Sequence, residues 1–133
     1  MDAVLIRALE AAGIILAGLF AYSGVNWLVL SRARRGSARL GAGKPAIVYF
    51  TTPDCVPCKT VQRPAIQRLQ ERLGDQLRVI EVDARQNPQM AREWGVLSVP
   101  TTFILDAAGK PVHVNHGVAS ADKLLAQLNT ARR

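Results

Sequence analysis

The sequence predicts an α/β domain with a mixed four-stranded sheet, preceded by one transmembrane helix. Short apolar runs of strand character alternate with segments of helical spacing over residues 45–133. An uncharged run of twenty residues occupies positions 11–30. Both cysteines of the 133-residue chain lie in Cys55-Val56-Pro57-Cys58, between a predicted strand and a predicted helix. We therefore divide the chain into an N-terminal transmembrane anchor (1–30), a basic juxtamembrane linker (31–44) and one domain (45–133).

The apolar run near the N-terminus is long enough to cross a bilayer. A helix of about twenty residues spans about 30 Å, the thickness of the hydrocarbon core. A cleaved signal peptide and a buried helix of a soluble protein are the alternatives. A signal peptide carries positive charge before its apolar stretch, whereas here Asp2 comes early and an arginine cluster follows. We therefore expect an uncleaved, single-pass anchor that contacts the membrane through residues 11–30.

The net charge of +7 is concentrated beside that anchor, because residues 31–44 hold five basic and no acidic side chains. No aromatic residues interleave with these arginines, so the composition favours a membrane surface over nucleic acid as a partner. Basic flanking segments stay in the cytoplasm, which favours a cytoplasmic C-terminal domain; an extracytoplasmic one stays open as the alternative. The segment is also rich in glycine, and we expect it to be a flexible linker.

Local patterns predict each element of the domain in turn. The first strand is mostly apolar, as expected for a strand buried on both faces, and a right-handed crossover makes the second strand parallel to it. Pro64 is expected to kink the long helix between them. The predicted elements are a strand at Ala46–Thr51, a helix at Val56–Leu73, a strand at Leu77–Val82, a short helix from Asn87 to about Trp94, a hairpin of Thr101–Leu105 and Pro111–His116, and a last helix capped by Ser120.

The position of the cysteine pair predicts redox chemistry. Cys55 lies at a helix N-terminus, where unpaired backbone N–H groups favour a thiolate. We expect it to be an exposed nucleophile and Cys58, one turn later, to be its buried resolving partner. Zinc is the alternative, since His113 and His116 would complete a set of four ligands. Their odd spacing on a strand directs them to opposite faces, so we predict neither a metal site nor a bound cofactor.

With Val99-Pro100-Thr101 following about forty residues after the cysteines, the chain resembles the thioredoxin family. The resemblance implies a three-layer, thioredoxin-like fold. Full-length thioredoxins begin with a further strand and helix, and residues 31–44 are too short for both, so we expect that unit to be missing or vestigial. The residues that carry the resemblance are Tyr49-Phe50, Cys55 to Lys59, Asn87-Pro88, Trp94-Gly95-Val96, Val99 to Thr101, Ala108-Gly109-Lys110 and Gly117.

The resemblance also implies a groove for an extended substrate segment beside the cysteines. Pro100 is expected to follow a cis peptide bond and to belong to the catalytic site; an ordinary trans proline is the alternative. His116 falls on the rim of the groove, where relatives usually carry an apolar residue. It either tunes partner choice and pH response or is an exposed bystander. The expected substrate-binding residues are Val56, Pro57, Val99, Thr101, His116 and Gly117.

Two positions depart from the family pattern. Asp54 stands where thioredoxins usually carry tryptophan, and a carboxylate there is expected to raise the pKa of Cys55. Tyr49 stands where they keep a buried aspartate beneath the cysteines, and a phenol with a pKa of about 10 cannot accept a proton near neutral pH.

Glu81 is our candidate to replace that aspartate as a catalytic proton acceptor. It lies in the middle of the second predicted strand, and neighbouring strands are about 4.8 Å apart. A carboxylate there can reach the space beneath Cys58, with Tyr49 as a hydrogen-bond partner, and burial would raise its pKa into a useful range. The alternative is that Glu81 points outwards and pairs with a surface arginine such as Arg68 or Arg72.

The sequence thus predicts a membrane-anchored thiol–disulfide oxidoreductase. Its expected partners are protein disulfides or dithiols and an upstream thiol reductase or other electron donor. One alternative is an extracytoplasmic protein that serves disulfide formation or cytochrome maturation. Another is a non-enzymatic adaptor that uses the groove only for binding, which the presence of both cysteines disfavours.

Overall fold

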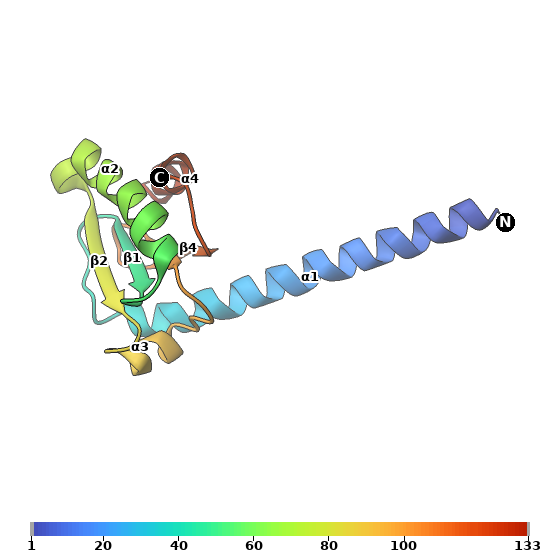
Figure 1. Ribbon diagram of the computed structural model, residues 1–133, viewed down its shortest axis with the longest axis horizontal. Helices are drawn as coiled ribbons and strands as arrows, with labels where there is room; N and C mark the ends of the chain where they lie inside the picture. Colours follow the sequence, from blue (N-terminus) through green and yellow to red (C-terminus); the bar gives the residue numbers. More distant parts are fainter. Residues whose placement is uncertain (1, 133) are drawn as a thin grey trace.

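A computed structural model describes residues 2–132 (Figure 1). A long helix leads into an α/β domain in which all predicted strands and helices are present, and β2 begins one residue later than predicted. The elements are α1 (Ala3–Ser37), β1 (Ala46–Thr51), a π-helical turn (Cys58–Gln62), α2 (Arg63–Leu73), a 3-10 turn (Gly74–Gln76), β2 (Arg78–Asp83), α3 (Pro88–Glu93), β3 (Thr101–Leu105), β4 (Pro111–His116) and α4 (Ala121–Ala131).

The four strands form one mixed sheet in the order β2-β1-β3-β4, as predicted. β1 pairs in parallel with β2 and antiparallel with β3, and β4 pairs antiparallel with β3. Within residues 2–132 no strand precedes β1, which agrees with the expected loss of the first strand of the family. Helices α2 and α4 cover one face, whereas α3 and the end of α1 cover the other.

The strand β1 lies in the interior of the sheet, between β2 and β3, and both of its faces are buried. Every residue from Ala46 to Thr51 is buried, and successive side chains point to opposite faces. Ile47 and Tyr49 face α2 and α4, together with both cysteines. Val48 and Phe50 face α3 and α1. The strand therefore delivers the following loop, which carries Cys55, to one fixed end of the sheet.

The helix predicted over Val56–Leu73 is interrupted before its proline. A proline has no N–H to donate to the carbonyl four residues back. Directly before the predicted kink at Pro64, the chain makes a wider π-helical turn over Cys58–Gln62, and the Arg63 N–H donates to the Cys58 carbonyl. Such turns occur at functional sites, and this one lies directly at the second cysteine.

The end of α1 packs on the domain. Val29, Ala33 and Ser37 recur every four residues along one side of the helix and are 4%, 0% and 4% exposed. Val29 and Ala33 belong to the hydrophobic cluster that contains Trp94. Gly36 lies against the same indole, because a Cβ there would be 2.3 Å from Trp94 Nε1. The last turns of α1 are therefore a structural part of the domain.

This docking corrects the prediction of a flexible linker at 31–44. The prediction is wrong as far as Ser37, because the helix continues to that residue. The small residues between the arginines face the domain, while Arg34 and Arg35 face solvent. Only residues 38–45 connect the docked helix to β1, and Arg78 of β2 donates hydrogen bonds to the carbonyls of Leu40 and Gly41 in that segment, at 3.0 and 3.3 Å.

The rest of α1 extends away from the domain (Figure 1). It contains an 18-residue window with a mean hydropathy of 2.0, none of which is buried. By length and composition the helix can cross a membrane, although a signal sequence near an N-terminus passes the same test. The large exposed side chains are Val4, Leu5, Ile6, Leu9, Ile14, Ile15, Leu16, Leu19, Phe20, Tyr22, Val25, Trp27 and Leu28.

Candidate active site

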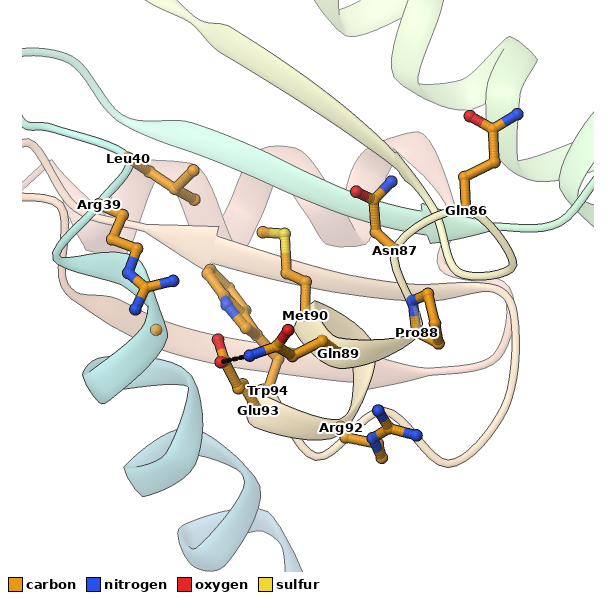
Figure 2. Close-up of a pocket in the computed structure, with 11 residues that line it drawn as sticks. Arg39, Leu40, Gln86, Asn87, Pro88, Gln89, Met90, Arg92, Glu93 and Trp94 are labelled. Carbon is orange, nitrogen blue, oxygen red and sulfur yellow. Dashed lines mark hydrogen bonds between the residues drawn. The ribbon is translucent and has the colours of Figure 1, made fainter.

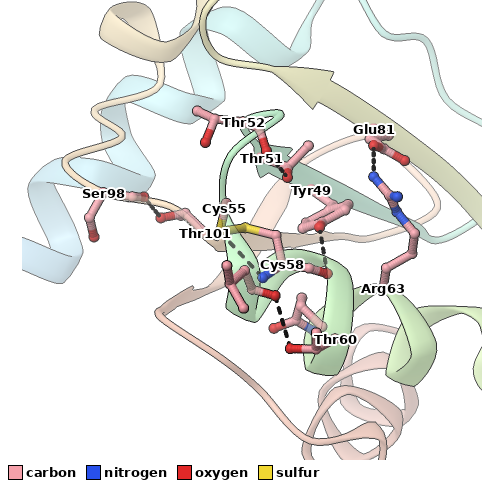
Figure 3. The surroundings of a disulfide bond; sticks show 12 residues. Tyr49, Thr51, Thr52, Cys55, Cys58, Thr60, Arg63, Glu81, Ser98 and Thr101 are labelled. Carbon is pink, nitrogen blue, oxygen red and sulfur yellow. Dashed lines mark hydrogen bonds and ion pairs between the residues drawn. A yellow bond between two sulfur atoms is a disulfide. The ribbon is translucent and has the colours of Figure 1, made fainter.

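The two cysteines are joined by a disulfide at the end of β1, with an S–S distance of 2.05 Å (Figure 3). Cys58 is fully buried, and Cys55 is 8% exposed. The predicted order of accessibility is therefore confirmed, although Cys55 is much less exposed than predicted. The Cys58 backbone N–H donates to Cys55 Sγ at 3.3 Å, an arrangement that stabilises a thiolate at Cys55 in the reduced state.

The Val99–Pro100 peptide bond is cis, as predicted. Its loop is braced on both sides. The Thr101 hydroxyl donates to the Ser98 carbonyl at 2.6 Å, and the Gly117 N–H donates to the Pro100 carbonyl at 2.9 Å. Thr101 is fully buried, so its side chain supports the loop and is not available to a substrate, contrary to the prediction.

The remaining predicted substrate residues lie at the surface. Val56 and Pro57 are exposed, and Val99 and Gly117 are partly exposed. His116 is exposed, but its ring is not free, because Nε2 lies 3.1 Å from Asn26 Oδ1 of α1. No sequence pattern predicted this contact between the rim and the N-terminal helix, since the two residues are 90 positions apart.

The two histidines of β4 point to opposite sides of the sheet, as their spacing predicts. His113 Nε2 lies 3.0 Å from the Thr130 hydroxyl of α4, whereas His116 bonds to α1 on the other side. Burial lowers the pKa of His113 below its ordinary value of 6.5. The two rings therefore do not converge with the cysteines on one site.

Tyr49 lies directly beneath the cysteine pair. Its hydroxyl donates to the Cys58 carbonyl at 3.2 Å, and the side chain is 1% exposed. Burial is the main cause that raises the pKa of Tyr49 above its ordinary value of 10.0. The phenol therefore stays protonated and holds the turn that carries Cys58.

Glu81 lies on the strand next to β1, as predicted, and is paired with Tyr49, but it is not buried. Its side chain is 47% exposed, and Oε1 forms a 2.7 Å ion pair with Arg63 Nη2. The expectation that burial tunes Glu81 is therefore wrong. The alternative of an ion pair with an arginine is correct in kind, but the partner is Arg63 and not Arg68 or Arg72.

Asp54 has a cationic partner that weakens its expected effect on Cys55. Its carboxylate lies 2.6 Å from Arg85 Nη2, and both side chains are well exposed. Hydrogen bonding from Thr52, with a smaller contribution from the Arg85 guanidinium, lowers the pKa of Asp54 below 3.8. The carboxylate is thus charged, and the arginine offsets part of its field at the thiol.

Gln62 is a site residue that the sequence analysis missed. It is fully buried, and its amide makes two hydrogen bonds to the backbone of Ala119, at 2.8 and 3.1 Å. These bonds fix the segment after β4 to the turn after Cys58. Gln62 lies four residues after Cys58, on the buried side of the helix, and this spacing is the signal that could have identified it.

The two largest cavities do not include the cysteines and are lined by residues of the end of α1 and of α3. One of about 470 Å³ opens between the end of α1 and α3 (Figure 2), on the opposite face of the sheet from the cysteines. Arg39, Met90, Arg92 and Trp94 are among the residues that line it. Beside Cys55, the exposed side chains of the disulfide site are those of Val56 and Pro57.

A dithiol pair at a helix N-terminus beside a cis-proline loop, on a mixed four-stranded sheet between helices, defines a thioredoxin-like thiol–disulfide oxidoreductase. The thioredoxin family model matches residues 37–130. The chain belongs to the thioredoxin family. Cys55 and Cys58 form its redox-type pair.

Individual relatives agree with this assignment. The chain is 40% identical over 94 residues to a thioredoxin of Mycolicibacterium smegmatis, covering 69% of this chain and 82% of the relative. It is 33% identical over 88 residues to the chloroplastic thioredoxin Y of Oryza sativa, covering 66% of this chain but only 51% of that protein. A thioredoxin variant structure from Halobacterium salinarum shares the fold, with a TM-score of 0.61, 24% identity and coverage of 68% of this chain and 77% of that one.

Proposed function

We propose that this protein is a membrane-anchored thiol–disulfide oxidoreductase that acts on disulfides of other proteins. The observation that carries the proposal is the joint placement of two features. The Cys55–Cys58 disulfide lies beside the loop with the cis Val99–Pro100 bond (Figure 3). The apolar part of α1, which contains an 18-residue window with no buried residue, extends from the same domain.

In the proposed reduction, the Cys55 thiolate attacks one sulfur of a substrate disulfide. The substrate S–S bond breaks, one substrate sulfur leaves as a thiolate, and a mixed disulfide forms. Cys58 loses its proton and attacks Cys55 Sγ, which expels the second substrate thiolate. Two electrons pass to the substrate, and the protein ends with the Cys55–Cys58 disulfide. A dithiol donor, such as an upstream thiol reductase, reverses this oxidation by the same exchange.

The residues around the cysteines have different roles in this reaction. The Cys58 N–H at 3.3 Å and the helix N-terminus stabilise the attacking thiolate. Val99 offers backbone groups to the substrate segment, while Val56, Pro57 and Gly117 form the surface around it. Water accepts the proton of Cys58, since Glu81 is exposed and paired. We assign Glu81 and Tyr49 to positioning the turn at Cys58 rather than to proton transfer.

We place the redox domain in the cytoplasm. The segment after the apolar part of α1 carries five basic residues, whereas only Arg7 precedes its uncharged run, and such an imbalance keeps the basic side in the cytoplasm. A reporter that is active on only one side of the membrane, fused to the C-terminus, tests this. Activity outside would reverse the orientation and favour extracytoplasmic disulfide chemistry.

The proposed activity is tested with the full chain in detergent. It is expected to reduce insulin with dithiothreitol as the donor, and Cys55→Ser is expected to abolish the acceleration. The full chain is also expected to stay in the membrane fraction in high salt. Insulin reduction no faster than with dithiothreitol alone would contradict the activity, and recovery in the soluble fraction without detergent would contradict the anchor.

A further inference from the structure

We propose that the redox face of this protein is turned towards the bilayer and exchanges disulfides with membrane-embedded proteins. The inference rests on the proposed function and adds the class of partner. Its starting point is the rigid joint between α1 and the domain, where Val29 and Ala33 are buried and Gly36 lies against Trp94. Because α1 is one helix over Ala3–Ser37, the docked end fixes the direction in which the remainder leaves.

The contact between Asn26 and His116 limits where the hydrocarbon can lie. The domain reaches α1 as far as Asn26, at 3.1 Å, and irregular backbone exposed to lipid is not tolerated in the hydrocarbon region. The span must therefore end before Asn26. Counting back about twenty residues, or about 30 Å, places it at about residues 5–25 rather than at 11–30. Trp27, which is 69% exposed, then lies at the interface, where tryptophan is enriched.

The shifted span includes two charged residues, Arg7 and Glu10, but only near its far end. They are one helical turn apart, so opposite charges can meet on the helix surface. The long arginine side chain can also reach the distant headgroups. The window of highest hydropathy is fully exposed, which leaves the apolar surface of this span available to lipid.

With this span, the rim of the redox site is the part of the domain nearest to the bilayer. The loop before β3 and the turn after β4 lie on the side towards which α1 departs (Figure 1). They are tied together by the Gly117 N–H bond to the Pro100 carbonyl. The rim carries exposed apolar side chains: Leu97 is 79%, Val56 is 66% and Val118 is 47% exposed. Exposed apolar surface of this kind marks interaction sites.

In this orientation the redox site lies at the membrane surface, so it can reach a partner whose cysteines lie at the same level. A folded protein in solution would have to enter between the rim and the headgroups to reach Cys55. A cysteine pair in a short loop between membrane-spanning segments lies at that level already, and apolar flanking residues fit Leu97 and Val118. The exchange is the one given above, with two electrons passing between the partner's cysteines and the Cys55–Cys58 pair.

A flexible insertion in α1 tests the orientation. We would insert about twelve Gly/Ser residues, which reach about 20 Å, between Val25 and Asn26. This leaves both the span and the docked segment intact but frees the domain to rotate. The same insertion between Asp75 and Gln76, in the 3-10 turn after α2, is the control.

Each pre-reduced protein is placed in phosphatidylcholine–phosphatidylglycerol vesicles, and its oxidation in a single turnover is followed by alkylation. The disulfide substrates are hydroxyethyl disulfide, insulin, and a single-span peptide with its disulfide at headgroup level. The native chain is expected to prefer the peptide to insulin. The insertion after Val25 is expected to lower that preference about tenfold by removing the imposed geometry, and the control insertion is expected to leave it unchanged.

An unchanged preference after the Val25 insertion would overturn the proposal. Failure of every variant to react with hydroxyethyl disulfide would instead contradict the redox function itself, so the two failures are distinguishable. An independent measurement uses a fluorophore on Leu97→Cys or Asp75→Cys in a Cys55→Ser/Cys58→Ser chain. Spin-labelled lipid headgroups are expected to quench the probe at 97 and not at 75. Equal quenching would overturn the orientation, and quenching at 97 without peptide preference would mean that the rim binds lipid and not a protein.

Discussion

Replacing Gly36 by valine tests whether the end of α1 is part of the domain. A Cβ at this position would meet Trp94 Nε1 at 2.3 Å and Cδ1 at 2.7 Å, and the indole is fully buried. The helix propensities of glycine and valine differ by less than about 0.5 kcal/mol, so the steric effect dominates. Overpacking of this kind costs about 1–3 kcal/mol. We expect Gly36→Val to destabilise the domain by about 2 kcal/mol.

The assay is urea unfolding of the full chain in detergent, followed by the fluorescence of Trp94 in a Trp27→Phe background. With a denaturant slope of about 1–2 kcal/mol per M for a small domain, the midpoint is expected to fall by about 1–2 M. Arg35→Val, which places the same side chain on the exposed side of the helix, is the matched control and is expected to change little. Equal midpoints for the two variants would refute the docking of α1 against Trp94.

Three further outcomes follow from the site. Removing Gln62 with Gln62→Leu leaves the backbone groups of Ala119 unpaired and is expected to cost about 2–4 kcal/mol in urea unfolding, whereas the exposed Gln67→Leu is expected to be nearly neutral. Burial raises the pKa of Tyr49 in the folded protein above the value of about 10 in the unfolded chain. The protonated phenol therefore contributes its full stabilisation below about pH 10, and this contribution is lost as the pH rises through the raised pKa of the folded state. Tyr49→Phe is expected to remove that alkaline loss, and a steep loss in the variant would assign it to another group. Glu81→Gln is expected to leave the rate of mixed-disulfide resolution nearly unchanged from pH 6 to 9, and a defect confined to neutral pH would restore Glu81 as the proton acceptor.

The sheet could be predicted from the sequence because its signals are local. β1 alternates between two buried faces, and this gives the mostly apolar run that marks a central strand. Ser120 caps α4 as predicted, accepting a hydrogen bond from the Lys123 N–H at 3.2 Å. The cysteine pair was placed correctly because a strand, a turn and a helix fix it within a short stretch of chain. The cis bond before Pro100 was predicted instead from the resemblance to the thioredoxin family.

The unpredicted features depend on contacts between distant segments. Ala33 and Gly36 are small residues between arginines, so the sequence of this segment does not have the apolar pattern of a buried helix face. They form a packing surface only because the distant indole of Trp94 lies against them. The position of Glu81 was correct, but its partner depends on where the π-helical turn puts Arg63. His116 was placed at the rim, whereas its bond to Asn26 follows from the docking of α1.

The proposed roles of the two cysteines are tested by finding which one forms a mixed disulfide with a partner protein. Cys58→Ser and Cys55→Ser full-length chains would be expressed, and their membranes quenched with acid and alkylated. Cys55 is 8% exposed and Cys58 is fully buried, so nucleophilic attack should start at Cys55. We expect Cys58→Ser to accumulate dithiothreitol-sensitive adducts with membrane proteins through Cys55, and Cys55→Ser to accumulate none. Equal trapping by the two variants would contradict the proposed roles.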